Sequence, residues 1–241
     1  MTELRSDPTR TPGEAQSKLC AELARAQLAQ IAHGRRVIVL VEGPDGAGKK
    51  AALKALAATF DPCHFAVHCI HRERRSSADG HWLARFWRHL PAAGETTMFL
   101  RSWYRRVIDE RLAGEVEGKM LARAFDEINE FEAQQRDYGT LLVKLFFTVD
   151  PEVQARRLAE RAADPWLADA SLELDASHPG YGQAIEDLRD NSDTRWSPWT
   201  FIDGNDSAHA ADSALTAVLD AYRLAMPLEP PHMLATGERA A

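Results

Sequence analysis

The sequence predicts an α/β fold in which helices cover both faces of a parallel sheet. Residues 37–41, VIVLV, are continuously apolar and mostly β-branched, as strands buried on both faces are. Similar runs alternate with helical patterns along the chain, which is the order of a three-layer α/β/α sandwich. The length of 241 residues and the hydrophobic content of 45% suffice for one substantial core.

The chain before the first strand is expected to contain a leader and one helix. Residues 1–16 are polar and include two prolines, which is typical of a disordered leader. Residues 17–33 place their apolar side chains near one helical face, with Ser17 as a candidate N-cap and Gly34 as the stop.

The remaining elements follow from the same patterns. We expect, in order, strand 37–41, helix 51–60, strand 64–70, an aromatic helix 81–90, strand 96–100, helix 117–138, strand 141–149, an arginine-rich helix 151–163, strand 199–203 and helix 207–224. Residues 164–194 read as loop and short helix. The predicted organisation is one domain over 17–226, with a lid at about 150–195 and a flexible tail over 227–241.

Residues 43–49 carry the motif that organises this chain. They match G-x-x-x-x-G-K, between an apolar strand and a helix, which is the context that a phosphate-binding loop requires. We expect backbone N–H groups of Gly43, Gly46, Ala47 and Gly48 to surround a phosphate, and Lys49 to reach the outer phosphates. A bare glycine-rich turn is the alternative, and the combination of strand, lysine and helix disfavours it.

Lys50 departs from the usual loop. Ser or Thr is common after the lysine, where its hydroxyl holds Mg²⁺. The sequence therefore does not predict an ordinary ATPase or GTPase. Lys50 either adds a positive charge for a phosphate-rich ligand or points to solvent from the first turn of the helix, and both interpretations remain open.

Arginines outside the loop are further candidates for anion binding. Arg72, Arg74 and Arg75 follow a predicted strand at the sheet edge where ligands bind, although each alone reads better as part of a solvated loop. Arg157 and Arg161 are four residues apart and share a helical face. They fit either a lid over a transferred phosphoryl group or a solvated helix paired with neighbouring glutamates.

Composition excludes several classes of protein. The net charge of −7 disfavours a dedicated nucleic-acid binder. Cys20, Cys63 and Cys69 lack metal-ligand spacing and leave an odd thiol, which fits a reducing cytoplasm. We expect no membrane segment and no signal peptide, because no stretch has the required apolar length.

The order of motifs resembles that of type-2 polyphosphate kinases. It runs G-x-D-x-x-G-K, HLPAAGE, RSWY, LLVKLFF, an arginine-rich helix with D-P-W, and SPWTFIDGND, from about 36 to 206. The resemblance implies a thymidylate-kinase-like P-loop fold. It also implies phosphoryl transfer between inorganic polyphosphate and a nucleoside mono- or diphosphate, with Mg²⁺ (or Mn²⁺), and a homo-oligomer or an active paralogue as a partner.

The resemblance also implies roles for individual residues. Asp45 matches a loop aspartate that orients the acceptor phosphate or its metal, and Lys49 matches the loop lysine. Arg101 matches the arginine after the family's Walker B aspartate, and Arg157 with Arg161 match lid arginines. Such transfer depends on positioning and on cations rather than on covalent chemistry.

The departures from the family pattern concern the metal. Where the family usually reads F-D-R-S-W-Y-N-R, this chain reads F-L-R-S-W-Y-R-R, so Leu100 replaces a metal-binding aspartate and Arg105 an asparagine. Lys50 replaces a glycine, and Ser207 a lysine. The chain looks most like the degenerate N-terminal copy of the tandem polyphosphate:AMP phosphotransferases.

Three interpretations follow. The chain is an active polyphosphate-dependent kinase in which Asp45 is the metal anchor, and Lys49, Arg101, Arg105 and the lid arginines bind phosphate. Alternatively, it is an inactive member that binds polyphosphate or nucleotide, or that pairs with an active paralogue. The third, an unrelated ATP-dependent kinase, is disfavoured because position 50 is not Ser or Thr.

Overall fold

The computed structural model describes residues 13–71, 80–164, 174–229 and 231. Arg72, Arg74 and Arg75 therefore lie outside the described residues, as do most of the expected leader and tail. Within the described part, no helix is long and apolar enough to cross a membrane. Cys20, Cys63 and Cys69 are all free thiols.

Five parallel strands form one sheet in the order β2-β3-β1-β4-β5. The strands are β1 (Arg36–Glu42), β2 (Phe65–Cys69), β3 (Thr96–Leu100), β4 (Thr140–Thr148) and β5 (Trp199–Asp203). The central strand β1 hydrogen-bonds to β3 on one side and β4 on the other. The predicted α/β fold with a parallel sheet is confirmed.

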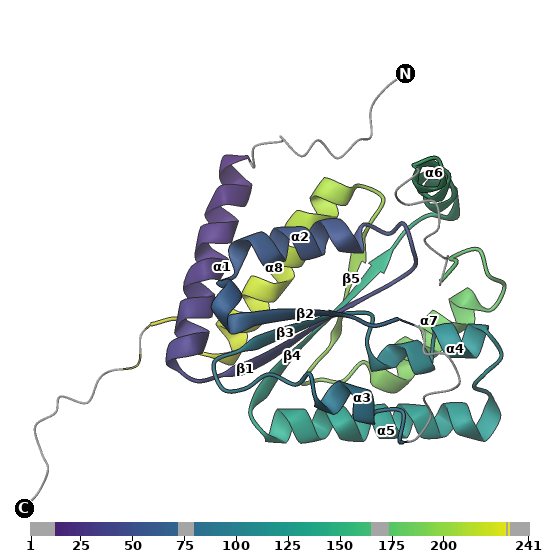
Figure 1. Cartoon of the computed structure of the whole chain (residues 1–241), viewed down its shortest axis with the longest axis horizontal. Coiled ribbons are helices and arrows are strands. Elements are labelled where there is room, and N and C mark those ends of the chain that lie inside the picture. Colours follow the sequence, from purple (N-terminus) through teal and green to yellow (C-terminus); the bar gives the residue numbers. More distant parts are fainter. Residues whose placement is uncertain (1–12, 72–79, 165–173, 230, 232–241) are drawn as a thin grey trace, which may run out of the picture.

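Helices cover both faces of this sheet (Figure 1). One layer holds α1 (Glu14–Ala32), α2 (Lys49–Thr59) and α8 (Ser207–Ala225), and the other holds α3 (Ala84–Trp87), α4 (Asp109–Leu112), α5 (Gly118–Asp137) and α7 (Tyr181–Ser192). Helix α6 (Pro151–Ala162) follows β4 and stands apart from both layers, toward the carboxyl ends of the strands.

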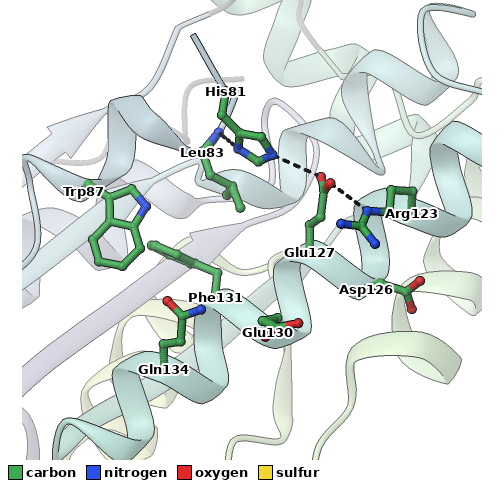
Figure 2. Close-up of a pocket in the computed structure, with 9 residues that line it drawn as sticks. All are labelled: His81, Leu83, Trp87, Arg123, Asp126, Glu127, Glu130, Phe131 and Gln134. Carbon is green, nitrogen blue, oxygen red and sulfur yellow. Dashed lines mark hydrogen bonds and ion pairs between the residues drawn. The ribbon is translucent and has the colours of Figure 1, made fainter.

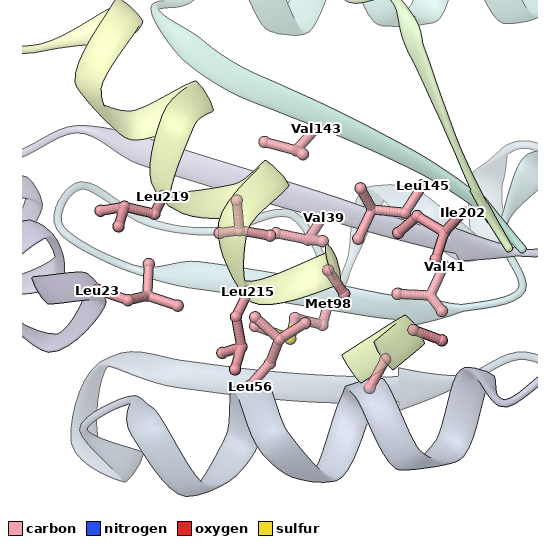
Figure 3. Close-up of a cluster of buried hydrophobic side chains, with 14 of the residues drawn as sticks. Leu23, Val39, Val41, Leu56, Met98, Val143, Leu145, Ile202, Leu215 and Leu219 are labelled. Carbon is pink, nitrogen blue, oxygen red and sulfur yellow. The ribbon is translucent and has the colours of Figure 1, made fainter. Parts of the chain in front are cut away.

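Two apolar clusters explain why β1 is apolar at successive positions. Val37, Val39 and Val41 belong to the cluster that includes Leu56 of α2 and Leu215 of α8 (Figure 3). The intervening residues of the strand belong to a second cluster with the aromatic side chains of α3 and α5. A strand buried on both faces has no polar face to alternate with.

Two helix predictions were wrong in their bounds. Helix α1 begins at Glu14 with Gly13 as its N-cap, and the N–H of Ser17 is already bonded to the Gly13 carbonyl, so Ser17 is not the cap. The aromatic helix expected over 81–90 is only the short α3. There the His81 ring accepts a hydrogen bond from the Leu83 N–H, a local bond that competes with helix formation.

A buried ion pair, absent from the sequence expectations, joins β4 to α5. Lys144 and Glu132 are fully buried, with Lys144 Nζ 3.2 Å from Glu132 Oε2. Lys144 Nζ also donates to the Ser192 carbonyl at 2.6 Å, and Trp103 Nε1 donates to Glu132 Oε1 at 2.9 Å. Together these bonds connect β4, α5, α7 and the 3-10 turn η3 (Trp103–Arg106).

We therefore expect Glu132→Leu to destabilise the fold by about 3–5 kcal/mol, because it leaves the Lys144 ammonium buried without its counter-ion. The double variant Glu132→Leu/Lys144→Met should recover much of that loss, since neither charge remains. Urea unfolding followed by circular dichroism measures both. A single variant as stable as the wild type would contradict the assigned role of the pair.

Candidate functional site

The phosphate loop connects the end of β1 to the start of α2. Gly48, with φ +84°, is the N-cap of α2, which begins at Lys49. Gly43 has φ +126°, and a Cβ there would lie 2.2 Å from the Phe147 carbonyl oxygen of β4. No other residue fits this approach, so the glycine fixes where the loop leaves the sheet.

Lys49 lies over the loop that precedes it. Its Nζ donates to the carbonyls of Gly43 and Pro44, each at 2.6 Å, and the side chain is buried. Desolvation, helped by the charge of Arg101, lowers the pKa of Lys49 to about 8. The ammonium is thus held at the loop, where phosphate oxygens can replace carbonyl oxygens as its acceptors. Lys50, by contrast, is exposed on α2.

Arg101 lies at the carboxyl end of β3 and faces the loop. Its Nη2 donates to Asp45 Oδ1 at 2.8 Å, and its Nη1 pairs with Asp109 at the start of α4. Among the described residues it is the only non-glycine with a positive φ, +63°. Such strain is kept where surrounding contacts enforce it and often marks a functional site.

Arg105 is also close to this group. It is 1% exposed, its Nη1 donates to the Ile70 carbonyl at 3.3 Å, and the same atom lies 3.9 Å from Asp109 Oδ1. Arg105 is therefore buried beside Asp109, which also pairs with Arg101. Its contact with phosphate stays a prediction.

Helix α6 contacts the loop through Arg157 and Gln154. Arg157 donates to the carbonyls of Gly46 at 2.7 Å and Gly204 at 2.6 Å, and Gln154 Nε2 donates to the Asp45 carbonyl at 2.8 Å. Arg161 follows one turn later and is half-buried. Helix α6 therefore contacts the loop directly. Its role as a lid stays a prediction.

Several residues of this site were missed by sequence reasoning. Asp109 and Arg105 stand four residues apart, and Gln154 precedes Arg157 by nearly one turn, so both spacings were readable. Gly204 gave no such signal in the sequence. In the fold it passes so close to the loop that a Cβ at this position would lie 2.2 Å from the Ala47 carbonyl oxygen. Only the folded structure shows that approach.

Glu42 is a buried carboxyl group beside the loop. Its Oε1 accepts hydrogen bonds from the N–H and the hydroxyl of Ser102, each at 2.6 Å. Burial raises the pKa of Glu42 from 4.5 to about 7, against the lowering effect of the Ser102 bonds. The group therefore changes its charge near neutral pH.

This pKa predicts how stability depends on pH. The folded state holds the Glu42 proton more tightly than the unfolded chain does. The contribution of this protonation to the free energy of unfolding is therefore full below pH 4.5 and is lost as the pH rises through about 7. The free energy of unfolding lost across this pH range is on the order of 3 kcal/mol. Glu42→Gln should flatten the pH dependence of the urea midpoint in this window. The control Glu186→Gln, exposed on α7, should retain it.

The part of the chain that the structure describes offers no preformed metal site. Among the residues that the structure describes, no three His, Cys, Asp or Glu side chains group closely enough to hold an ion. The Asp45 carboxylate, the predicted metal anchor, pairs with Arg101. Leu100 lies in the same buried apolar cluster as Val41 and Ala47. The prediction of a metal at Asp45 does not fit this arrangement.

A pocket of about 270 Å³ lies on another part of the molecule, between α3 and α5 (Figure 2). Glu127 lies there between His81, at 3.6 Å, and Arg123, whose Nε donates to it at 2.9 Å. Asp126 and Glu130 also line the pocket. This excess of acidic groups opposes a polyanion, so the phosphate loop is the better candidate site.

Comparison with known proteins adds an independent result. The polyphosphate kinase 2 family model matches residues 9–227. A polyphosphate:AMP phosphotransferase of Pseudomonas syringae is 35% identical over 193 residues, which are 78% of this chain and 39% of that protein. A GDP-polyphosphate phosphotransferase of Mycolicibacterium smegmatis is 32% identical over 87% of this chain and 75% of that protein.

Solved structures agree with the fold. The crystal structure of a protein assigned as polyphosphate kinase 2 from Pseudomonas aeruginosa has a TM-score of 0.81 at 30% identity, covering 93% of this chain and 49% of that one. Polyphosphate kinase 2 from Arthrobacter aurescens has a TM-score of 0.79 at 23% identity, over 96% and 87%, which shows the fold alone. The chain spans less than half the length of the polyphosphate:AMP phosphotransferases it matches.

Proposed function

The chain belongs to the polyphosphate kinase 2 family, and from that premise we propose that it moves a phosphoryl group between inorganic polyphosphate and a nucleoside mono- or diphosphate. One observation carries the proposal. Lys49, Arg101 and Arg157, from three separate elements, converge on the same glycine loop. Phosphoryl transfer needs such cations, because its transition state spreads negative charge over the phosphoryl oxygens.

The proposed roles follow from the contacts. Lys49 and the N–H groups of the loop bind the phosphate chain at the start of α2, where the helix dipole favours an anion. Arg101, from the end of β3, and Arg157, from α6, bond to neighbouring residues of the loop, and in this proposal they contact transferred or bridging oxygens. Arg161 and the exposed Lys50 extend the positive surface along the polyanion.

The relatives suggest an acceptor. Three similar curated proteins are polyphosphate:AMP phosphotransferases, with which this chain shares 32–35% identity. We propose AMP as the first acceptor to test, and correspondence to the degenerate copy within the tandem enzymes. A homo-oligomer, or a complex with an active paralogue, is part of this proposal.

A second function is favoured by one observation. Leu100 removes a carboxylate, and the remaining loop carboxylate, Asp45, is paired with Arg101. A chain with this lesion fits a subunit that binds polyphosphate or nucleotide without turning it over. Loss of a metal contact costs several kcal/mol of transition-state stabilisation, which would slow transfer by about a thousandfold or more.

The two functions are separated by measuring phosphoryl transfer from long-chain polyphosphate to AMP, ADP, GMP and GDP in Mg²⁺ or Mn²⁺, with Lys49→Ala as the blank. Turnover above this blank supports the kinase. Bound polyphosphate without turnover supports the binding subunit. Neither binding nor turnover would contradict both.

Lys49→Ala should weaken polyphosphate binding by at least about tenfold, because one charge-assisted contact is worth roughly 1.5–3 kcal/mol. Calorimetric titration measures it. The matched control is Lys54→Ala, which removes an exposed ammonium from the same helix and should change affinity little. Equal losses in the two variants would mean that the loop attracts polyphosphate only through overall charge.

A further inference from the structure

The end of β3 determines which charged groups stand beside the phosphate loop. The residue comes from the end of β3, beside position 100, where the family resemblance leads one to expect a metal-binding aspartate. Leu100 is 8% exposed and belongs to the apolar cluster between the sheet and α2. The strand thus contributes an apolar side chain and, directly after it, a cation.

The Arg101 guanidinium is held from two sides. Asp45, in the phosphate loop, accepts from Nη2 at 2.8 Å, and Asp109, at the start of α4, pairs with Nη1. The side chains of Arg101, Asp45 and Asp109 are only 8%, 15% and 6% exposed. Buried contacts of this kind are screened little by salt and fix the guanidinium in place.

The backbone of Arg101 supports the same conclusion. A φ of +63° is unfavourable for an L-residue. The strained backbone conformation occurs at the residue whose side chain pairs with both Asp45 and Asp109. The positively charged group stands at the loop carboxylate, which is where a metal ion would have to bind. Asp45 Oδ1 accepts from the guanidinium, and Asp45 Oδ2 accepts from the Leu174 N–H at 3.3 Å, so both carboxylate oxygens already have partners from the protein.

We propose that in this chain the Arg101 guanidinium, clamped between Asp45 and Asp109, supplies the positive charge that a cation held by the protein's carboxylates would otherwise supply. Polyphosphate then binds the loop without a metal ion on Asp45. The inference rests on the proposed function, because it concerns the same phosphate site.

Titration calorimetry with tripolyphosphate tests this inference on the wild-type chain, once in EDTA and once in excess Mg²⁺. The two affinities should agree within about threefold, since cations fixed in the fold supply the contacts. A loss of about tenfold or more in EDTA alone would overturn the inference while leaving the proposed function standing. No binding in either buffer would overturn both.

A second measurement uses Mn²⁺ alone, followed by the paramagnetic resonance signal of the free ion. The wild-type chain should bind Mn²⁺ no better than Asp45→Asn does. A wild-type site that Asp45→Asn removes would overturn the inference. Because the comparison needs neither substrate nor turnover, its result does not depend on whether the chain is an active kinase.

A variant reverses the expectation. Arg101→Gln removes the charge while keeping a side chain that can hydrogen-bond, so tripolyphosphate affinity in EDTA should fall by at least about tenfold. Mg²⁺ should restore part of it, because Asp45 is then released. The control Arg223→Gln, at the far end of α8, should behave as wild type in both buffers. If Arg101→Gln keeps wild-type affinity in EDTA, the inference is wrong.

Discussion

The position of β1 at the centre of the sheet is the constraint on which the site depends. Its backbone hydrogen-bonds to β3 and β4 in parallel register, so the carboxyl ends of the three strands reach the same edge. The strand register alone therefore brings Glu42, Arg101 and the segment after β4 close together. Gly43 completes this edge, because only a residue without Cβ can pass so close to Phe147.

The chain's own sequence predicted the parts that depend on local pattern. The apolar runs gave the strands nearly to the residue, and the glycine motif gave the loop, because burial on both faces and a left-handed turn each demand particular residue types. Asp109 and Lys144 were not anticipated. Their roles arise from partners distant in space, such as Glu132 on α5 for Lys144, and no local periodicity encodes such a pair. The lid, the oligomer and the metal lie beyond what local pattern decides.

The electrostatic character of the site differs from a set of independent cations. Lys49, Arg101 and Arg105 are all buried, and burial of a charge is tolerated when counter-ions or hydrogen bonds surround it. Glu42, Asp45 and Asp109 lie among them, and Arg101 joins two of these carboxylates directly. Because these charges are close together, removing one of them changes the electrostatic potential at, and the pKa of, its neighbours.

The backbone conformation of Arg101 has a consequence for how sequences of this kind change over time. Glycine would adopt φ +63° without strain, but glycine at position 101 would leave the buried carboxylates of Asp45 and Asp109 without the guanidinium that pairs with both. Arginine at this position has a strained backbone conformation but places a guanidinium at the loop. A substitution at this position therefore cannot relieve the backbone strain without also unpairing two buried carboxylates, and this restricts the residues that the fold tolerates there.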